Sequence, residues 1–422
     1  MIAIDDRLLD PQELARSGPA HAAIAQFGHP DGRRFAVCLA DPADWLGLFF
    51  AIRAVGASVL PIHPATPYAA ARRLAVSAGC HALLHHAAEP EALPDAAPSP
   101  GMLLQMSSGT TGAPKCVERP WEHIERELNS YVATFREPDN MTPIVACPTT
   151  HSYGLICGVL AALKRGRTPV LVDPGNPKHL LKRLRETDRP LLYASPAVLH
   201  TVAQLAPRDE TLHAAMTSGT LLPAAWFDRI RARTRHMFQQ YGCSEAGVVA
   251  VNPDMAAPED MGRPLPHLAV TAGTADAPAE ILVRGPAGKV RTSDLGALRP
   301  DGMLLFVARL DDTINVSGLN VYPQEVEDVA MTMPGVADAV AFRLADRFAG
   351  ERVGLVFSAG GTVPVAAVMD WLRGRLASHQ LPAQVIQLPA VPRQANGKVS
   401  RREIAARHAE GRLVPALEGA AS

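Results

Sequence analysis

Apolar positions along the chain follow two alternating patterns. Short apolar runs at residues 34–39, 101–104 and 168–172 predict β-strands, whereas residues 45–56 and 177–187 have the spacing of amphipathic helices. Strands that alternate with helices are typical of an α/β architecture with largely parallel strands. An apolar content of 47% is sufficient for extensive buried cores.

The same alternation begins again as a separate unit towards the C-terminus. Residues 338–344 and 352–358 predict strands, and residues 323–333 predict a helix that begins at proline, where the missing N–H costs nothing. A chain of 422 residues corresponds to about two or three domains. We therefore predict a large N-terminal domain of mixed sheets with flanking helices over residues 1–310 and a small α+β C-terminal domain over residues 311–422.

Charge and composition narrow the class of function. The chain has 41 Lys and Arg against 42 Asp and Glu without a long basic block, so nucleic-acid binding is not expected. The first seven residues carry acidic groups where a signal peptide would be basic, which favours a cytoplasmic protein. The apolar region at residues 45–61 contains Arg53 and falls short of the about 18 residues of a membrane span. Six cysteines without a Cys-x-x-Cys pair predict free or buried thiols rather than a zinc site.

The strongest candidate for chemistry is a loop rich in hydroxyls and glycine that follows the strand at residues 101–104. Its candidate phosphate-binding residues are Ser107, Ser108, Gly109, Thr110, Thr111, Gly112 and Lys115. Small side chains let backbone N–H groups approach an anion, and the lysine adds positive charge. The loop is not a Walker A motif, because two residues separate Gly109 from Gly112 and Cys116 follows Lys115. A flexible surface loop is the alternative.

This loop resembles the signature loop of the AMP-forming acyl-activating superfamily, which includes acyl-CoA synthetases, adenylation domains and luciferases. An ordered series of motifs is more specific than one motif. Further segments that match in the family's order are residues 151–154, 241–245, 280–285, 292–296, 309–327 and 396–401. The resemblance implies a hinge at Asp311. The N-terminal region is shorter than in typical members, since the signature loop begins near residue 106.

The resemblance implies a two-step reaction. ATP and Mg²⁺ would convert a carboxylic acid to an acyl adenylate with release of pyrophosphate, and a thiol would then take the acyl group with release of AMP. Lys398 would supply charge to the transition state of the first step. Glu245 would bind Mg²⁺, and Ser244, at a position usually occupied by Thr, would contact the AMP phosphate.

The resemblance also implies the nucleoside-binding residues. It assigns adenine contacts to Ser218, Gly219, Thr220, Tyr241 and Gly242, and ribose contacts to Asp294 and Arg309. A carboxylate that accepts from both hydroxyls suits a vicinal diol. A core tyrosine, an ordinary turn at residues 218–220, and a surface ion pair of Arg309 with Asp311 or Asp312 are the alternatives. Ser293 and Ala308 depart from the glycines usual in these motifs.

For the second step, the resemblance implies that the small domain swings and presents Gly318, which leaves room for the pantetheine arm of CoA or of a carrier protein. His151 resembles the gate beside the acyl and thiol channels, although a satisfied, partly buried histidine is an equal alternative. Ser152 stands where amino-acid-activating members have Asp, so a fatty, aryl or other simple acid is favoured. The chain shows no carrier domain, so a carrier would be a separate protein.

Two other classes of function remain open. The shortened N-terminal region and the replacements at Ser293 and Ala308 fit an inactive nucleotide-binding scaffold, but retention of Lys398, Glu245 and Asp294 argues against it. An oxidoreductase of the luciferase type shares the adenylation motifs, but no segment supplies the oxygen chemistry. A ligase that forms acyl adenylates and then thioesters is the preferred hypothesis.

Overall fold

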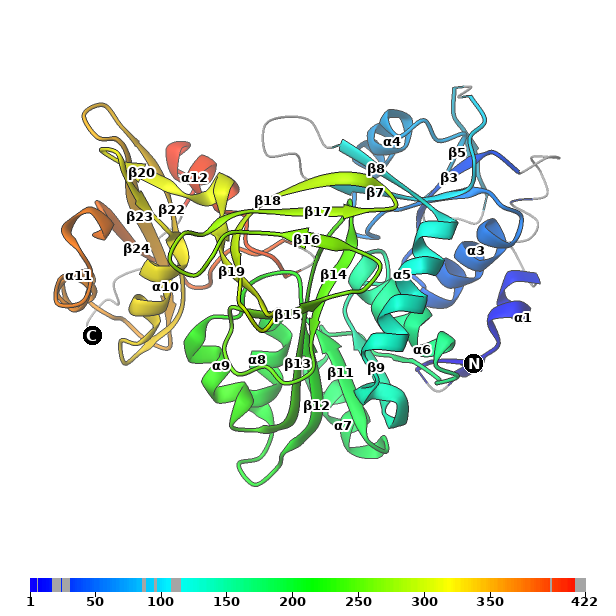
Figure 1. The fold of residues 1–422 in the computed structure, drawn as a ribbon, viewed down its shortest axis with the longest axis horizontal. Helices are drawn as coiled ribbons and strands as arrows, with labels where there is room; N and C mark the ends of the chain where they lie inside the picture. Colours follow the sequence, from blue (N-terminus) through cyan, green and yellow to red (C-terminus); the bar gives the residue numbers. More distant parts are fainter. Residues whose placement is uncertain are drawn as a thin grey trace, which may run out of the picture.

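The computed structural model describes residues 1–5, 7–16, 24, 31–85, 89–94, 97–107, 115–394 and 397–413. A large sheet-rich N-terminal domain lies beside a smaller C-terminal domain, drawn yellow to red in Figure 1. This arrangement confirms the predicted fold class. The exact boundary at residues 310 and 311 stays a prediction.

Thirteen strands form the largest sheet within the described residues. Their hydrogen-bonded order is β16 (Ala269–Thr271), β17 (Ala279–Gly285), β18 (Gly288–Leu298), β19 (Leu304–Arg309), β15 (Asp260–Pro264), β14 (Gly247–Asn252), β13 (Thr234–Cys243), β12 (Leu212–Thr217), β11 (Pro190–Ala194), β9 (Thr142–Ala146), β10 (Val170–Leu171), β1 (Ile2–Ile4) and β2 (Arg7–Leu9). The run from β1 to β13 is parallel, and pairing from β13 to β16 is antiparallel. Parallel strands are covered on both faces, which explains their continuous apolar sequences.

A second sheet carries the strand that leads into the candidate phosphate loop. Its order is β6 (Glu91–Ala92), β5 (Ala82–His85), β3 (Arg34–Cys38), β4 (Ser58–Pro61), β7 (Met102–Ser107) and β8 (Lys115–Pro120). Strands β7 and β8 are antiparallel, and Ser107 pairs with Lys115. The loop therefore spans a hairpin, and its residues 108–114 lie outside the described part of the chain.

The small domain has its own sheet, which begins directly after the 3₁₀ turn η3 (Leu310–Asp312). Its strands follow the order β21 (Leu319–Val321), β20 (Ile314–Val316), β23 (Gly350–Ala359) and β22 (Val336–Asp346), with β24 (Gln384–Gln387) paired to β23. Ile314, Val326, Leu355 and Phe357 belong to the buried core of this domain. A separate core and a short connection at η3 are the features expected of an independently moving unit.

Helices flank all three sheets. In the large domain they are α1 (Pro11–Arg16), α3 (Pro42–Ala54), α4 (Tyr68–Ser77), α5 (Trp121–Thr134), α6 (Ala161–Lys164), α7 (Pro177–Glu186), α8 (Pro196–Leu205) and α9 (Ala224–Arg231), with a 3₁₀ turn η1 (Glu137–Asn140) and a π-helix η2 (Tyr153–Leu160). In the small domain they are α10 (Pro323–Met331), α11 (Val365–Arg373), α12 (Arg401–Ala409) and the 3₁₀ turn η4 (Ser378–Gln380). None of the helices in the described ranges is long and apolar enough to cross a membrane.

Local capping explains where the structure differs from the expected element bounds. Helix α3 begins before the predicted residue 45, because Asp41 accepts hydrogen bonds from Ala43 N at 2.7 Å and Asp44 N at 3.0 Å. Helix α11 ends at Arg373, and Gly374 follows as its C-cap. Capping side chains and glycine set these ends, whereas apolar spacing alone predicts only the middle of a helix.

Candidate active site

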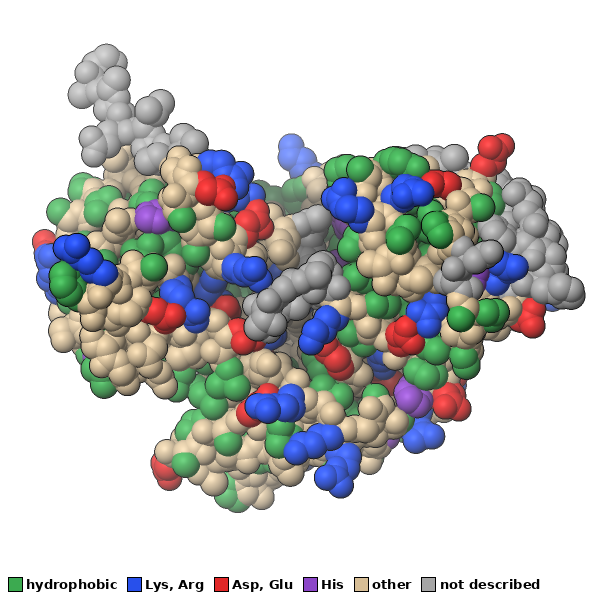
Figure 2. All heavy atoms as spheres, turned by 90° about the horizontal axis from the view of Figure 1, so that it is seen from above, with side chains coloured by type: hydrophobic (Ala, Val, Ile, Leu, Met, Phe, Trp, Pro, Cys, Tyr) green, Lys and Arg blue, Asp and Glu red, His purple; other side chains and the backbone are tan. Residues whose placement is uncertain are grey.

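Lys398 lies at the boundary between the two domains. A Cβ atom added to Gly219, in the turn after β12, would lie 3.2 Å from Lys398 Cε. The lysine is solvent-accessible, yet the surrounding protein and Arg309 lower its pKa, while Asp294 acts in the opposite direction. Figure 2 shows Lys, Arg, Asp and Glu side chains along this boundary. The lysine from the small domain therefore lies near the predicted nucleotide residues of the large one.

Asp294 on β18 is buried at the centre of the predicted ribose site. Tyr241 on β13 donates its hydroxyl to Asp294 Oδ2 at 2.5 Å, and Arg309 Nε on β19 lies 3.2 Å from Oδ1. Burial raises the pKa of Asp294, and Arg309 and Tyr241 partly oppose this change. Although Arg309 lies within ion-pair distance of Oδ1, this oxygen accepts no well-aligned hydrogen bond from the described residues. A buried acceptor of this kind can receive a hydrogen bond from a ribose hydroxyl.

The residues predicted to contact adenine lie at the ends of two neighbouring strands. Strands β12 and β13 run parallel, so the turn that holds Ser218, Gly219 and Thr220 lies beside Tyr241. Ser218 Oγ donates to Gln240 O at 3.1 Å. Tyr241 is 8% exposed and packs in an apolar cluster of the large domain. The tyrosine is thus a core residue whose hydroxyl holds Asp294, and its contact with adenine stays a prediction.

Glu245, the predicted metal ligand, is exposed in the turn between β13 and β14, next to Ser244. No group of three or more His, Cys, Asp or Glu in the described segments could hold a metal ion by itself. Mg²⁺ in nucleotide sites is usually bound by one or two carboxylates, substrate phosphates and water. An accessible single carboxylate therefore fits a Mg²⁺ ion that arrives with ATP.

A buried ion pair supports this turn from behind, and sequence reasoning missed it. Arg119 on β8 pairs with Glu127 on α5, with side-chain exposures of 5% and 2%. Glu127 Oε1 also accepts from Val248 N at 2.8 Å. A Cβ on Gly247 would lie 2.5 Å from both charged groups, so only glycine fits there. A carboxylate on the apolar face of α5 was the signal in the sequence, because Ile124, Leu128 and Tyr131 share that face.

Gly242 allows the two strands of this turn to approach closely. A Cβ at Gly242 would lie only 2.2 Å from Gly247 O, so any other residue would displace the turn that presents Ser244 and Glu245. The requirement for glycine is therefore a matter of backbone approach. It is independent of whether Gly242 also contacts adenine.

His151 and Ser152 directly precede the π-helix η2. Burial, and to a smaller extent the charges of Lys398 and His63, together lower the pKa of His151 to about 4, so the imidazole is neutral near pH 7. Gln105 Nε2 on β7 donates to Ser152 Oγ, while Gln105 Oε1 is buried without a partner among the described residues. Sequence reasoning missed Gln105, although it stands three residues before Ser108 of the signature loop.

The backbone of η2 depends on two glycines. A Cβ on Gly154 would lie 2.4 Å from Pro148 O, and one on Gly158 would lie 2.9 Å from the methyl groups of Val145. Tyr153, between His151 and these glycines, donates its hydroxyl to Met216 O at 2.6 Å. π-Helical segments are rare and often lie at functional sites. This one brings the His151 segment against the ends of β9 and β12.

Gly318 lies apart from the residues described so far. It forms the two-residue turn between β20 and β21 with Ser317, and the φ angles of +53° at Ser317 and +89° at Gly318 match a type I′ hairpin. Asn315 Oδ1 accepts from Gly318 N at 2.9 Å. No atom lies within 4 Å of a Cβ added to Gly318. The structure thus brings Lys398 to the nucleotide residues, and it leaves Gly318 open.

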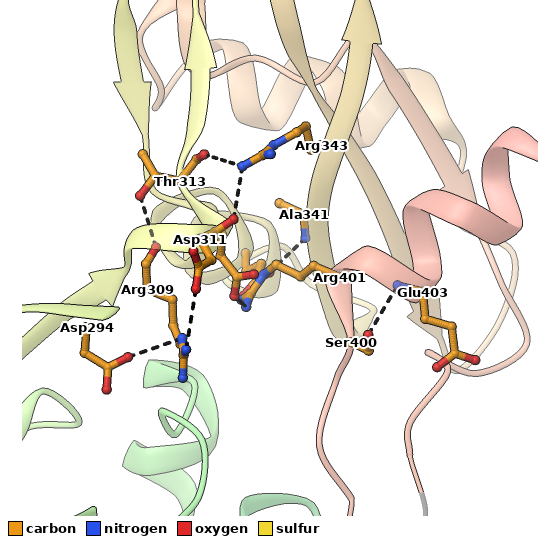
Figure 3. A network of polar contacts seen from close by, with 11 residues as sticks. Asp294, Arg309, Asp311, Thr313, Ala341, Arg343, Ser400, Arg401 and Glu403 are labelled. Carbon is orange, nitrogen blue, oxygen red and sulfur yellow. Dashed lines mark hydrogen bonds and ion pairs between the residues drawn. The ribbon is translucent and has the colours of Figure 1, made fainter. Parts of the chain in front are cut away.

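A polar network around η3 connects the hinge to the segment that carries Lys398 (Figure 3). Arg343 Nη2 donates to Asp311 O at 3.0 Å and to Thr313 O at 2.8 Å. Arg401, three residues after Lys398, contacts both carboxylate oxygens of Glu327 and lies 2.8 Å from Asp312 Oδ2. Arg401 therefore anchors the lysine segment to the hinge, a role that its place at the end of the final motif did not reveal.

Comparison with known proteins identifies the family of this chain. The AMP-binding enzyme family matches residues 88–290, and the AMP-binding enzyme C-terminal domain matches residues 325–398. A Bacillus anthracis protein, 3,4-dihydroxybenzoate–aryl-carrier protein ligase, is 38% identical over 91% of this chain and 93% of its own length. The chain belongs to the AMP-binding enzyme family.

Other members of the AMP-binding enzyme family are more distant. A 2-succinylbenzoate–CoA ligase from Lactococcus lactis is 24% identical over 72% of this chain and 70% of its own length. The ATP-bound crystal structure of MatB from Rhodopseudomonas palustris has the same fold, with a TM-score of 0.83 at 21% identity over 97% of this chain and 96% of that structure. The predicted enzyme class is confirmed: the protein is an adenylate-forming ligase that activates a carboxylic acid with ATP.

Proposed function

We propose that this ligase activates a hydroxylated aromatic acid and transfers the aroyl group to the phosphopantetheine thiol of a separate carrier protein. The observation that carries the first step is the position of Lys398 beside Gly219, Asp294 and Arg309. The 38% identity to an aryl-carrier protein ligase supports the choice of acid and acceptor.

In the first step, a carboxylate oxygen of the acid attacks the α-phosphorus of ATP. The bond from that phosphorus to the pyrophosphate oxygen breaks, and pyrophosphate leaves. Asp294 and Arg309 hold the ribose, and Lys398 neutralises the negative charge that develops at the reacting oxygens. Glu245 would hold Mg²⁺, which neutralises phosphate charge when bound.

Gln105 and Ser152 support a hydroxylated aromatic substrate. The buried Oε1 of Gln105 lacks a donor among the described residues, and a buried acceptor without a partner is costly. A phenolic hydroxyl would supply that donor, whereas a fatty acid chain would not. Ser152 also offers no carboxylate for the ammonium group of an amino acid, in agreement with the preference for a simple acid.

In the second step, the thiol sulfur attacks the acyl carbon, a thioester bond forms, and AMP leaves with the carboxylate oxygen that was bonded to phosphorus. The thiol loses its proton to solvent or to a nearby base. For this step the small domain would rotate at Asp311, withdraw Lys398 and present Gly318. We expect the enzyme to act in the cytoplasm, where ATP and a holo carrier protein are both present.

CoA is the alternative acceptor, because the Lactococcus lactis relative is a CoA ligase. A first assay measures pyrophosphate release from MgATP with 3,4-dihydroxybenzoate, salicylate, benzoate and octanoate, with hydroxylamine as the trap for the adenylate. A second assay measures thioester formation with a holo aryl-carrier protein or with CoA by mass spectrometry. We expect release to be fastest with the hydroxylated acids and thioester to form on the carrier.

The Gln105→Leu variant tests the proposed contact with the ring hydroxyl. It should lower the preference for dihydroxybenzoate over benzoate by about tenfold, because one buried hydrogen bond is lost. Ser130→Ala is a matched control, since its hydroxyl is also buried without a partner among the described residues but lies on α5. Octanoate activation at the rate of the aromatic acids, or no release with any acid, would contradict the proposed function.

A further inference from the structure

The tip of the β22–β23 hairpin presents an unusually exposed aromatic side chain. Phe348 is 84% exposed, the largest value for a bulky apolar residue among those described. Asp346 Oδ1 accepts from Phe348 N at 2.9 Å and from Ala349 N at 2.8 Å, which fixes the tip in a turn. Arg347 Cζ lies 4.6 Å from the centre of the Phe348 ring, within cation–π range. An ordered turn therefore holds the ring in solvent.

The same hairpin tip borders Gly318. Ser317 N donates to Ala349 O at 3.0 Å, and Val316 pairs with Gly350 across β20 and β23. Leu319, on the other side of Gly318, is 53% exposed. We call Leu319, Arg347 and Phe348 the tip surface. It adjoins the glycine where the pantetheine arm is proposed to pass.

We propose that the tip surface is the docking site for the carrier protein, an inference that rests on the proposed function. A phosphopantetheine arm is attached to the surface of its carrier, so the carrier must rest on the enzyme around the point where the arm enters. Aromatic and arginine side chains contribute most strongly to protein interfaces. The tip surface offers both beside Gly318.

The charges around the tip surface indicate the chemistry of the partner. Hydrogen bonds from the backbone N–H groups of Ala349 and Phe348 lower the pKa of Asp346, and the charges of Arg352 and Arg347 add a smaller effect in the same direction. Glu351 lies 3.1 Å from Arg343. The acidic groups near the tip therefore have partners inside the small domain. A carrier with an apolar contact bordered by acidic side chains complements Phe348 and Arg347.

The tip surface would move together with Gly318. Strands β20 and β23 are hydrogen-bonded neighbours in one sheet, so rotation of the small domain keeps Phe348 beside the turn. In the present arrangement Lys398 lies against the large domain and the tip surface faces solvent. A carrier could bind the tip and follow Gly318 into the site for the second step.

The test uses Phe348→Ser and Arg347→Glu in the full-length enzyme, supplied with purified acyl adenylate. Each variant is assayed for transfer to a holo aryl-carrier protein, to CoA and to free pantetheine, and pyrophosphate release is measured separately. We expect the KM for the holo carrier to rise about tenfold, with transfer to pantetheine and pyrophosphate release unchanged. Arg375→Glu is the matched control, because Arg375 Cζ lies 3.5 Å from the ring centre of Trp371 elsewhere on the small domain.

The possible results separate this inference from the proposed function. If the wild-type enzyme forms adenylate but does not acylate the carrier, the proposed acceptor is wrong. If the wild type acylates the carrier and both variants do so with an unchanged KM, only the docking site is wrong. A selective loss with CoA would also overturn the inference, since it would mean that the tip surface binds the nucleotide of CoA. Equal losses with carrier and pantetheine would indicate damage at Gly318 instead.

Discussion

The two candidate catalytic faces of the small domain differ in their surroundings. Lys398 lies against Gly219 of the large domain, near Asp294 and Arg309, and Arg401 anchors its segment to Glu327 and the hinge. Gly318 has no atom within 4 Å of an added Cβ. One face is therefore assembled with the large domain, and the other is exposed. The difference is what we expect if this arrangement serves the proposed first half-reaction and the second requires the small domain to move.

Polar contacts from helix α9 help to hold the small domain against the large one. Trp226 Nε1 on α9 donates to Ala337 O at 3.2 Å, and Ala224 N donates to Asp328 Oδ1 at 3.1 Å. Arg393 Cζ lies 5.3 Å from the Trp226 ring centre. Polar interfaces between domains generally permit relative motion. Hydrogen bonds of this kind can be exchanged for bonds to water when the small domain moves.

Lys398→Ala should have the largest effect on activity, because it removes the cation that the small domain places against the large domain. We expect adenylate formation to fall by about 100-fold or more, because a cation near the transition state is lost. Transfer from supplied acyl adenylate should stay close to the wild-type rate. Pyrophosphate release and thioester formation, measured separately, check this prediction. Equal losses in both assays would break the comparison between the two faces.

Gly318→Val should give the opposite result. The φ of +89° is unfavourable for valine, and the side chain would occupy the path of the arm. Thioester formation should fall by about tenfold or more, with pyrophosphate release unchanged. Gly360→Val is the matched control, because Gly360 also has no atom near an added Cβ and its φ is not positive. A larger loss of pyrophosphate release than of thioester would contradict the assignment of Gly318.

Arg401→Met tests the comparison between the two faces by weakening only the contact that anchors the segment of Lys398. Glu327 is buried, and removal of one partner from a buried ion pair typically costs about 3–5 kcal/mol of unfolding free energy. We expect a lower urea midpoint and a slower first half-reaction. The Glu327→Gln, Arg401→Met double variant should recover part of the stability, since no buried charge is left alone. Normal stability of the single variant would argue against the anchor.

A change of pH should have the smallest effect on adenylate formation among these tests. The pKa of Lys398 is lowered, so its cation is lost as pH rises through a value below the ordinary lysine value of about 10.4. Because the folded pKa is below the unfolded one, the charged lysine costs stability at lower pH, and this cost disappears as pH rises. The rate of the first step should change in the opposite direction and fall as pH rises, since this step needs the lysine cation. A pH–rate profile should show an alkaline decline for adenylate formation that is absent from thiol transfer with supplied adenylate.

Much of the site could be predicted because its residues occur in contiguous motifs. Tyr241, Glu245, Asp294 and Lys398 were identified from their neighbours in the sequence, and their assignment to one nucleotide site stays a prediction. The missed residues act through distant partners. Arg119 needs Glu127 and the turn at Gly247, and no local pattern links those three segments.

The sequence by itself determined the alternation of strands and helices, the family and the adenylate-forming activity, because these depend on local spacing and on short motifs. Only the tertiary structure decided which of these groups meet. It paired Gln105 with Ser152 and Arg401 with Glu327, and it brought Phe348 beside Gly318. Such contacts arise from strand register and domain packing, and these follow from the burial of side chains far apart in the chain.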